Sequence, residues 1–195
     1  VGSSYPLPCA IGDDHGTAVA GIVLARDGNA VGGAGVAPRA DLVGYSALAT
    51  SFDADIADAL TRGLPSNGIY QNSWGSPDDG KLGTVAASFD AAIETGIATG
   101  RGGRGAVYVF AGGNGGCYAL DGQGNCLSET AGLDGYLNHR GVIATCAVDH
   151  RGRKPEYAEI GANLLVCGPT SNEAGSSRIT TAAPRDGYRS DFSGS

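Results

Sequence analysis

The stretches AVYVFA at residues 106–111 and VIATCAV at residues 142–148 decide the fold class of this chain. Both are rich in β-branched and aromatic residues, which favour strands, and neither alternates between apolar and polar residues. A strand without that alternation is covered on both faces, as strands are in a parallel sheet. The sequence therefore predicts an α/β fold with a mostly parallel central sheet flanked by helices.

Helical patterns alternate with apolar runs along the rest of the chain. The expected helices cover residues 18–26, 53–64 and 82–99, and the further expected strands cover residues 40–48, 69–73, 163–167 and 178–182. The first of these helices opens near His15 and is apolar all round, which predicts that it is buried. Residues 112–138 form a long polar, Gly-rich insertion, and a loop of that length in a compact domain is usually functional.

The composition predicts one globular domain over residues 1–195. Hydrophobic residues make up 42% and charged residues 17% of the chain, which supplies a core and contradicts disorder. The formal net charge of -7 argues against a nucleic-acid partner and suits cationic ligands or substrates. No apolar run approaches the roughly 20 residues that cross a bilayer, so no membrane span is expected.

The cysteines, at positions 9, 117, 126, 146 and 167, form no C-x-x-C pair, which argues against a zinc ribbon or a redox dithiol. Cys117 and Cys126 flank a Gly-rich stretch and could pair across a surface loop, which would suit an oxidising compartment. Cys146 and Cys167 lie in apolar runs and are interpreted as buried small hydrophobic residues.

Three motifs carry residues that suit chemistry, although each is a weak signal alone. His15 lies in DDHGTAVAG at residues 13–21, just before a helix, where it is either a structural residue or a catalyst. The stretch QNSWGSPDDG at residues 71–80 ends in residue types that suit a turn. AGGNGG at residues 111–116 follows a predicted strand but lacks the spacing of a phosphate-binding turn.

Taken together and in this order, the motifs resemble those of the subtilisin-like serine proteases, and within them the kexin- and furin-like proprotein convertases. The resembling stretches are HGTAVAG at 15–21 and GAGVAP at 33–38 for the histidine block, VFAGGNGG at 109–116 for the oxyanion-asparagine block, and SWG at 73–75, DDG at 78–80, DGY at 134–136 and PEYAE at 155–159 for convertase segments. The resemblance covers essentially the whole chain. It implies a three-layer subtilisin-like fold, of which part is missing.

The resemblance implies a serine endopeptidase with a Ser-His-Asp mechanism. His15 would be the general base, and Asn114 would donate to the oxyanion; the alternative for Asn114 is a turn residue in a left-handed conformation. Nothing before residue 13 matches the aspartate block. FSGS at 192–195 resembles the residues just before the nucleophile, so we expect the catalytic serine to follow Ser195, with Ser195 itself as the alternative. The 195 residues alone are therefore expected to be inactive.

Specificity for basic residues is also implied by the resemblance. Asp78 and Asp134 would be two carboxylates of a pocket for Arg or Lys before the cleaved bond. Ser73, Trp74 and Gly75 would pair with the extended substrate as an added strand. Asp13 and Asp14 would either line the pocket for the residue second before the cleaved bond or lie in a surface loop.

Calcium is the implied cofactor, because it takes hard oxygen ligands. The loop at residues 26–33 resembles the subtilase calcium loop. There Asn29 would give a side-chain oxygen, and Arg26, Val31 and Gly33 would give carbonyl oxygens. A second site, of the convertase type, would use Asp78, Asp121 and Glu159.

The chain is thus expected to be part of a kexin-type subtilase catalytic domain, secreted or in the secretory pathway, monomeric, and acting on polypeptides with basic residues. One alternative is a broad-specificity bacterial-type subtilisin, which an Asp134 pointing away from Asp78 would favour. The other is a pseudoprotease kept for binding, which any residue but serine after Ser195 would favour.

Overall fold

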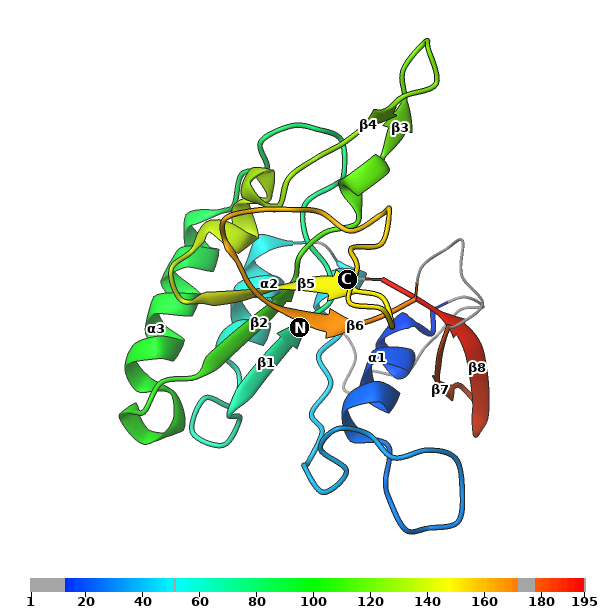
Figure 1. Cartoon of the computed structure of the whole chain (residues 1–195). Coiled ribbons are helices and arrows are strands. Elements are labelled where there is room, and N and C mark those ends of the chain that lie inside the picture. Colours follow the sequence, from blue (N-terminus) through cyan, green and yellow to red (C-terminus); the bar gives the residue numbers. More distant parts are fainter. Residues whose placement is uncertain (1–12, 51, 172–177, 195) are drawn as a thin grey trace.

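Four parallel strands form the central sheet, in the order β1–β2–β5–β6 (Figure 1). They cover Ile69–Asn72 (β1), Val107–Ala111 (β2), Val142–Val148 (β5) and Leu164–Pro169 (β6). This computed structural model describes residues 13–50, 52–171 and 178–194. The predicted α/β class is confirmed, as are these four strands, because each apolar run pairs in parallel with its neighbour in the sheet.

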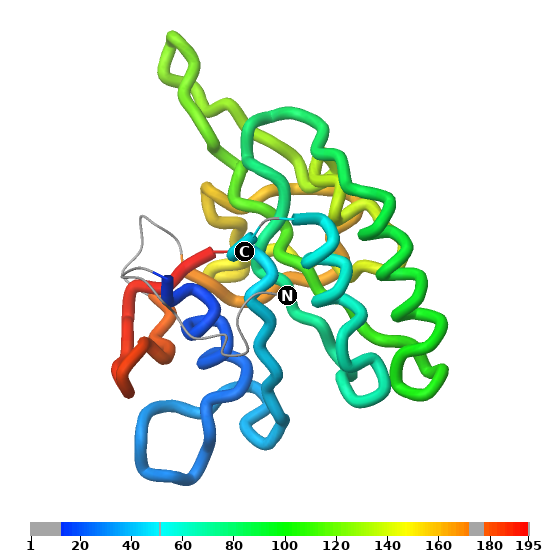
Figure 2. The backbone as a smooth tube through the Cα atoms, turned by 180° about the vertical axis from the view of Figure 1, so that it is seen from behind, coloured from blue at the N-terminus to red at the C-terminus, as the bar shows by residue number. Residues whose placement is uncertain are grey.

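Two helices, α2 (Asp53–Thr61) and α3 (Ala87–Gly103), pack against each other along one side of the sheet (Figures 1 and 2). The strand side chains that enter this core include Tyr108 and Phe110, both with no exposed surface. Helix α3 begins later than expected, because the Gly83 N–H donates to the Leu133 carbonyl at 2.7 Å instead of entering a helix. None of the described helices is long and apolar enough to cross a membrane.

Helix α1 (His15–Leu24) packs on an antiparallel hairpin of β7 (Ile179–Ala183) and β8 (Gly187–Phe192). Within α1, Ala18 alone is buried, so the prediction of a buried helix is wrong. The Thr181 hydroxyl of the hairpin donates to the Ala18 carbonyl at 2.6 Å. The hairpin confirms the strand expected at 178–182, whereas β8, which carries charged residues, was not expected from the sequence.

The strand expected at residues 40–48 does not form. Leu42 and Val43 are 62% and 55% exposed, and no strand of the described residues pairs with this segment. The end of the segment enters a single 3-10 turn, η1 (Ala47–Ala49). Strand-forming residues need a neighbouring strand for their backbone groups, and the part of the chain that the structure describes supplies none.

The insertion at residues 112–138 consists of short elements rather than one open loop. A small hairpin of β3 (Ala119–Leu120) and β4 (Cys126–Leu127) projects from the body (Figure 1). Single-turn helices precede and follow it: η2 (Gly115–Cys117), η3 (Ala131–Leu133) and η4 (Gly135–Asn138).

Two disulfides are present among the described residues. The bond Cys117–Cys126 closes the β3–β4 hairpin, as the sequence suggested. The bond Cys146–Cys167 shows that the interpretation of these two residues as buried hydrophobic residues is wrong. The reason is strand pairing: Cys146 of β5 lies opposite Cys167 of β6, and Cys167 is exposed. Cys9 lies outside the described residues.

Two glycines of α1 offer a matched test of the helix–hairpin contact. A Cβ at Gly21 would lie 2.5 Å from Thr181 Oγ1 and 2.7 Å from the Ala182 nitrogen, whereas a Cβ at Gly16 meets nothing within 4 Å. We expect Gly21→Ala to lower the free energy of unfolding by about 1–3 kcal/mol, as overpacking does. Gly16→Ala should leave it unchanged or raise it by up to about 1 kcal/mol, because alanine favours helix. Urea unfolding of both variants checks this, and equal effects would contradict the close packing of α1 on β7.

Candidate active site

His15 is the first residue of α1, and its exposed imidazole lies beside the end of β8. The centroids of the His15 and Phe192 rings are 5.6 Å apart. Asp14 accepts hydrogen bonds from Arg189 Nη1 through both carboxylate oxygens, at 3.2 and 3.1 Å. The Arg189 guanidinium in turn lies over the Phe192 ring, 5.5 Å from its centroid. Arg189 therefore fixes the start of α1, and with it His15, against β8.

The ion pair with Arg189 gives the two acids that precede His15, Asp13 and Asp14, different surroundings. The Asp14 carboxylate is half-buried and bound to a cation of the chain itself. Its geometry favours a structural role over the predicted contact with substrate. Asp13 is exposed just before the helix, and its predicted role in substrate binding stays a prediction.

Asn114 is exposed and lies in the turn directly after β2. Its φ of -117° excludes the left-handed conformation that was its structural alternative. Gly113 takes that conformation instead, with φ of 95°, and a Cβ there would collide with the Glu159 carboxylate. The left-handed backbone conformation of the turn is thus taken by a glycine, Gly113, and not by Asn114. The carboxamide of Asn114 lies just beyond the carboxyl end of a parallel strand, which is where open α/β sheets carry their sites.

Three carboxylates come together beneath this turn. Asp78, Glu129 and Glu159 each offer an oxygen, and these oxygens lie within 4.8 Å of one another. Glu129 accepts from the Gly80 N–H at 2.7 Å and Glu159 from the Gly115 N–H at 2.9 Å. The predicted pairing of Asp78 with Glu159 is therefore found, and Glu129, which is 3% exposed, completes it.

Asp121 was predicted in this group but lies elsewhere. It sits at the tip of the β3–β4 hairpin, where its carboxylate accepts from the backbone N–H groups of Gln123 and Asn125, both at 2.8 Å. These bonds close the turn and account for the position of the side chain. Glu129 was missed because it lies in the aperiodic insertion, where the sequence offers no signal for which acid turns inward.

Glu159 shows that the cluster suits a cation. Burial, together with the charges of Glu129 and Asp78, raises the pKa of Glu159 to about 7. Its Oε2 atom is buried and has no hydrogen-bond partner among the residues that the structure describes. A buried, unpaired carboxylate oxygen is costly, and a divalent cation held by the three acids would satisfy it. The oxygen-only ligand set fits calcium better than a softer metal.

The raised pKa predicts how the stability of the metal-free chain depends on pH. Between pH 4.5, the usual value for glutamate, and about 7, Glu159 keeps its proton in the folded chain and loses it in the unfolded chain. The free energy of unfolding should therefore fall as the pH rises through this window, by on the order of 3 kcal/mol.

Chemical denaturation at pH 4.5 and 7.5 in a chelator checks this prediction. Glu159→Gln should flatten the dependence, whereas Glu156→Gln, on the exposed side of the same turn, should not. Equal pH dependence in both variants would contradict the assignment.

Asp134 lies against the segment predicted to bind substrate. Its carboxylate accepts from the Ser76 N–H at 2.9 Å, the Ser76 hydroxyl at 3.1 Å and the Tyr136 N–H at 2.8 Å. A Cβ at Gly75 would lie too close to Asp134 Oδ2, so any larger residue would have to displace the Asp134 carboxylate. Gly75, Ser76 and Tyr136 also line a surface hollow of about 370 Å³.

Trp74 anchors the same segment to the core. Its indole packs edge-on against Phe110 and Tyr136, with centroid distances of 5.2 and 5.0 Å. Gln71 Nε2 donates to the Ser73 hydroxyl at 2.7 Å. Both contacts hold residues 73–75 rigidly just beyond the carboxyl end of β1, as a strand-pairing role requires.

The loop at residues 26–33 borders a second, larger hollow. Arg26, Asn29, Val31 and Gly33 line this space of about 1320 Å³, together with residues of the β7–β8 hairpin. The Asn29 side-chain oxygen accepts from the Val31 N–H at 3.0 Å. This bond shapes the loop, and the calcium site proposed there stays a prediction.

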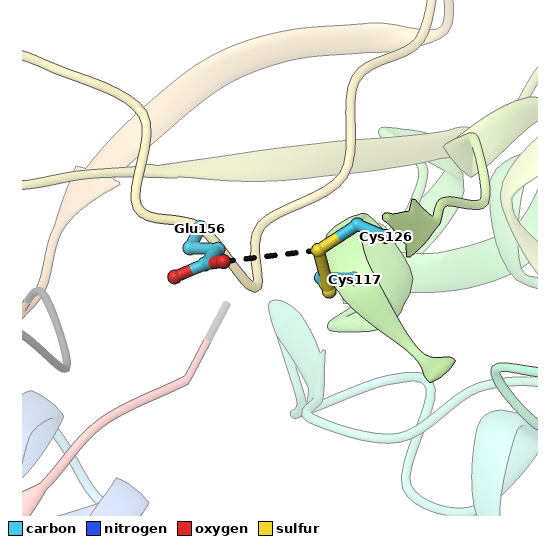
Figure 3. A group of neighbouring side chains, drawn as sticks. All are labelled: Cys117, Cys126 and Glu156. Carbon is cyan, nitrogen blue, oxygen red and sulfur yellow. Dashed lines mark hydrogen bonds between the residues drawn. A yellow bond between two sulfur atoms is a disulfide. The ribbon is translucent and has the colours of Figure 1, made fainter. Parts of the chain in front are cut away.

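Figure 3 shows a further cluster, of Cys117, Cys126 and Glu156. The two sulfur atoms are joined as a disulfide, and Cys126 Sγ lies 3.8 Å from Glu156 Oε1. A disulfide offers no thiolate to a metal, so the carboxylate cluster described above is the better cation site among the described residues.

A parallel sheet with an exposed asparagine and an acidic cluster just beyond strand β2, together with an exposed histidine at the start of α1, defines an α/β protein with an enzyme-like site. Residues 10–195 match the model of the subtilase family. The chain therefore belongs to the subtilase family.

The curated relatives are of the kexin type. The chain is 39% identical over 163 residues to a dibasic-processing endoprotease of Schizosaccharomyces pombe, covering 83% of this chain and 22% of the relative. It is 37% identical over 159 residues to kexin of Saccharomyces cerevisiae, covering 80% and 18%. Human proprotein convertase subtilisin/kexin type 7 is 37% identical over 158 residues, covering 79% and 19%. The chain thus spans about a fifth of the length of these relatives.

Solved structures support the same fold. A serine protease of Aeromonas sobria superposes with a TM-score of 0.78 at 25% identity, covering 93% of this chain and 33% of that chain. Its complex with a chaperone gives a TM-score of 0.81 at 23% identity, covering 99% and 39%. The predicted subtilisin-like fold is therefore confirmed.

Proposed function

We propose that this chain is part of a serine endopeptidase that cleaves polypeptides after Arg or Lys. The observation that carries the basic specificity is Asp134, a 6% exposed carboxylate held against Gly75 of the substrate-binding segment. No Lys or Arg of the described residues forms an ion pair with it. A basic substrate side chain would supply the missing cation.

In this proposal His15 takes the proton of a serine nucleophile and returns it to the leaving amine. Asn114, presented by the Gly113 turn, donates to the oxyanion that forms on the scissile carbonyl. The nucleophile is expected after Ser195, and the aspartate that orients His15 has no match among the sequence motifs. The histidine and the asparagine are thus two of the groups that the mechanism needs.

Calcium belongs to the proposal as a structural cation. Asp78, Glu129 and Glu159 would hold it, and its charge would offset the repulsion among the three acids. Because Asp78 also lies in the segment predicted to face a basic substrate, the cation would fix its orientation. Terbium luminescence measures the site directly: Glu129→Gln should weaken binding at least about tenfold, since ligand charge sets affinity. The exposed control Glu156→Gln should leave binding unchanged.

The two disulfides favour an oxidising compartment, so we propose secretion or residence in the secretory pathway. The relatives named as a dibasic-processing endoprotease and a proprotein convertase support polypeptide substrates.

Covalent labelling tests the enzyme class. A chain extended at both ends to a full catalytic domain should react with a fluorophosphonate at a single serine, the residue after Ser195. The same serine should be the nucleophile in peptide hydrolysis. Failure to label at any serine would favour the pseudoprotease alternative. Labelling together with equal cleavage after basic and apolar residues would favour a broad-specificity subtilisin.

A further inference from the structure

Tyr157 connects two parts of the proposed active site that are far apart in the sequence. Its backbone carbonyl accepts from the Gly116 N–H at 2.8 Å, two residues after Asn114. Its side-chain hydroxyl lies 3.4 Å from the Gly194 carbonyl, one residue before Ser195. One residue therefore contacts both the turn that presents Asn114 and the end of the segment that leads to the predicted nucleophile.

The hydroxyl of Tyr157 belongs to a small polar network at the carboxyl end of β6. It lies 2.9 Å from Thr170 Oγ1 and 3.1 Å from the Ser171 carbonyl, while Thr170 Oγ1 lies 3.0 Å from the Gly194 carbonyl. Thr170 is 9% exposed and Ser171 1% exposed. The hydroxyl protons of Tyr157 and Thr170 are thus shared among the carbonyls of Ser171 and Gly194 and the hydrogen bond between the two hydroxyls. Removing the Tyr157 proton leaves the carbonyl of the buried Ser171 less satisfied, and removing either proton leaves Gly194 less restrained.

The backbone around Tyr157 is itself held in place. Lys154 Nζ donates to the carbonyls of Pro155, Glu156 and Ala158, at 3.0, 3.3 and 2.7 Å. Glu159, directly after this turn, accepts from the Gly115 N–H. The turn therefore provides a rigid base from which the tyrosine hydroxyl reaches Gly194.

We propose that Tyr157 is a positioning residue: its hydroxyl fixes Gly194, and thereby the serine expected after Ser195, relative to the turn that carries Asn114. The inference rests on the proposed function. The nucleophile and the oxyanion donor must both reach one carbonyl, so their relative position determines the rate. A misplacement of about 1 Å can lower a rate by about 10²-fold.

The test uses the chain extended to a full catalytic domain. Tyr157→Phe removes the hydroxyl and keeps the ring, and Thr170→Val removes the partner hydroxyl while keeping the tyrosine. We expect each variant to lower kcat and the rate of fluorophosphonate labelling by tenfold to a hundredfold, with KM changed by less than about twofold, because binding groups are untouched.

Tyr45→Phe is the matched control. The Tyr45 hydroxyl also donates to a backbone carbonyl, that of Arg62, at 3.0 Å, and accepts from Asn67 at 2.8 Å. Its loss should lower the melting temperature as Tyr157→Phe does, but should leave kcat unchanged. Equal kcat in Tyr157→Phe and the parent, or equal losses in both tyrosine variants, would overturn the inference. A parent chain that neither labels nor cleaves would instead overturn the proposed function.

Discussion

Replacement of His15 by alanine, in a chain extended to a full catalytic domain, is expected to lower kcat by about 10⁶-fold. That is the loss caused by removing the base in subtilisin, a member of the same family. The physical reason is that a serine hydroxyl is a poor nucleophile unless a base accepts its proton. Steady-state hydrolysis of a basic peptide measures the loss, and circular dichroism checks that the variant is folded.

The control for this experiment is His150→Ala. His150 is also exposed, beside Arg151 in the loop after β5, and has no part in the proposed chemistry. Its replacement should leave kcat within about twofold of the parent, as surface substitutions do. Activity of the His15 variant close to that of the parent would show that another residue is the base.

Asp134→Asn is expected to weaken cleavage after Arg or Lys far more than cleavage after apolar residues. Loss of one partner of a desolvated charge pair costs roughly 2–5 kcal/mol, so the ratio of kcat/KM for basic over apolar peptides should fall at least tenfold. The ratio is the useful quantity, because the variant also disturbs the hydrogen bonds to Ser76 and Tyr136. A smaller fraction of folded enzyme would lower both kcat/KM values equally and would therefore leave their ratio unchanged.

Asp79→Asn is the matched control for this change. Asp79 lies in the same region but is exposed and forms an ion pair with Lys81 at 2.6 Å. Its replacement should leave the ratio unchanged. Equal loss of activity on both peptides in the Asp134 variant would remove the basis for basic specificity.

The parallel sheet was predictable because each strand carries its own local signal. The runs that became β2 and β5 lack alternation in sequence, which predicted strands of a parallel sheet. In the structure their buried residues nevertheless alternate with partly buried ones, so only one face of each strand is fully covered by the described residues. The segment at 40–48 carries a similar local signal, yet no strand within residues 13–50, 52–171 and 178–194 pairs with it. Pairing is a property that no local pattern contains. The Cys146–Cys167 disulfide was missed for the same reason, since only the register of β5 against β6 brings the two sulfur atoms together.

The candidate site was predictable where a motif carries it and not elsewhere. His15, Asn114, Asp78, Asp134 and Glu159 lie in quoted motifs. Glu129 and Arg189 do not, although one completes the acidic cluster and the other fixes Asp14. Both act through contacts between distant segments: Glu129 binds the Gly80 N–H and Arg189 spans from β8 to the start of α1. Asp121 is the opposite case: it was predicted to join the acidic cluster, but its carboxylate accepts hydrogen bonds from the turn of its own hairpin instead.

The central claim is that the chain is part of an endopeptidase specific for basic residues. The most direct test is the kcat/KM of the extended chain on two peptides that differ only in having Arg or Leu before the scissile bond. The proposed pocket predicts a preference for Arg of at least about 30-fold, since a desolvated charge pair contributes roughly 2 kcal/mol or more. Equal cleavage of the two peptides would contradict the claim.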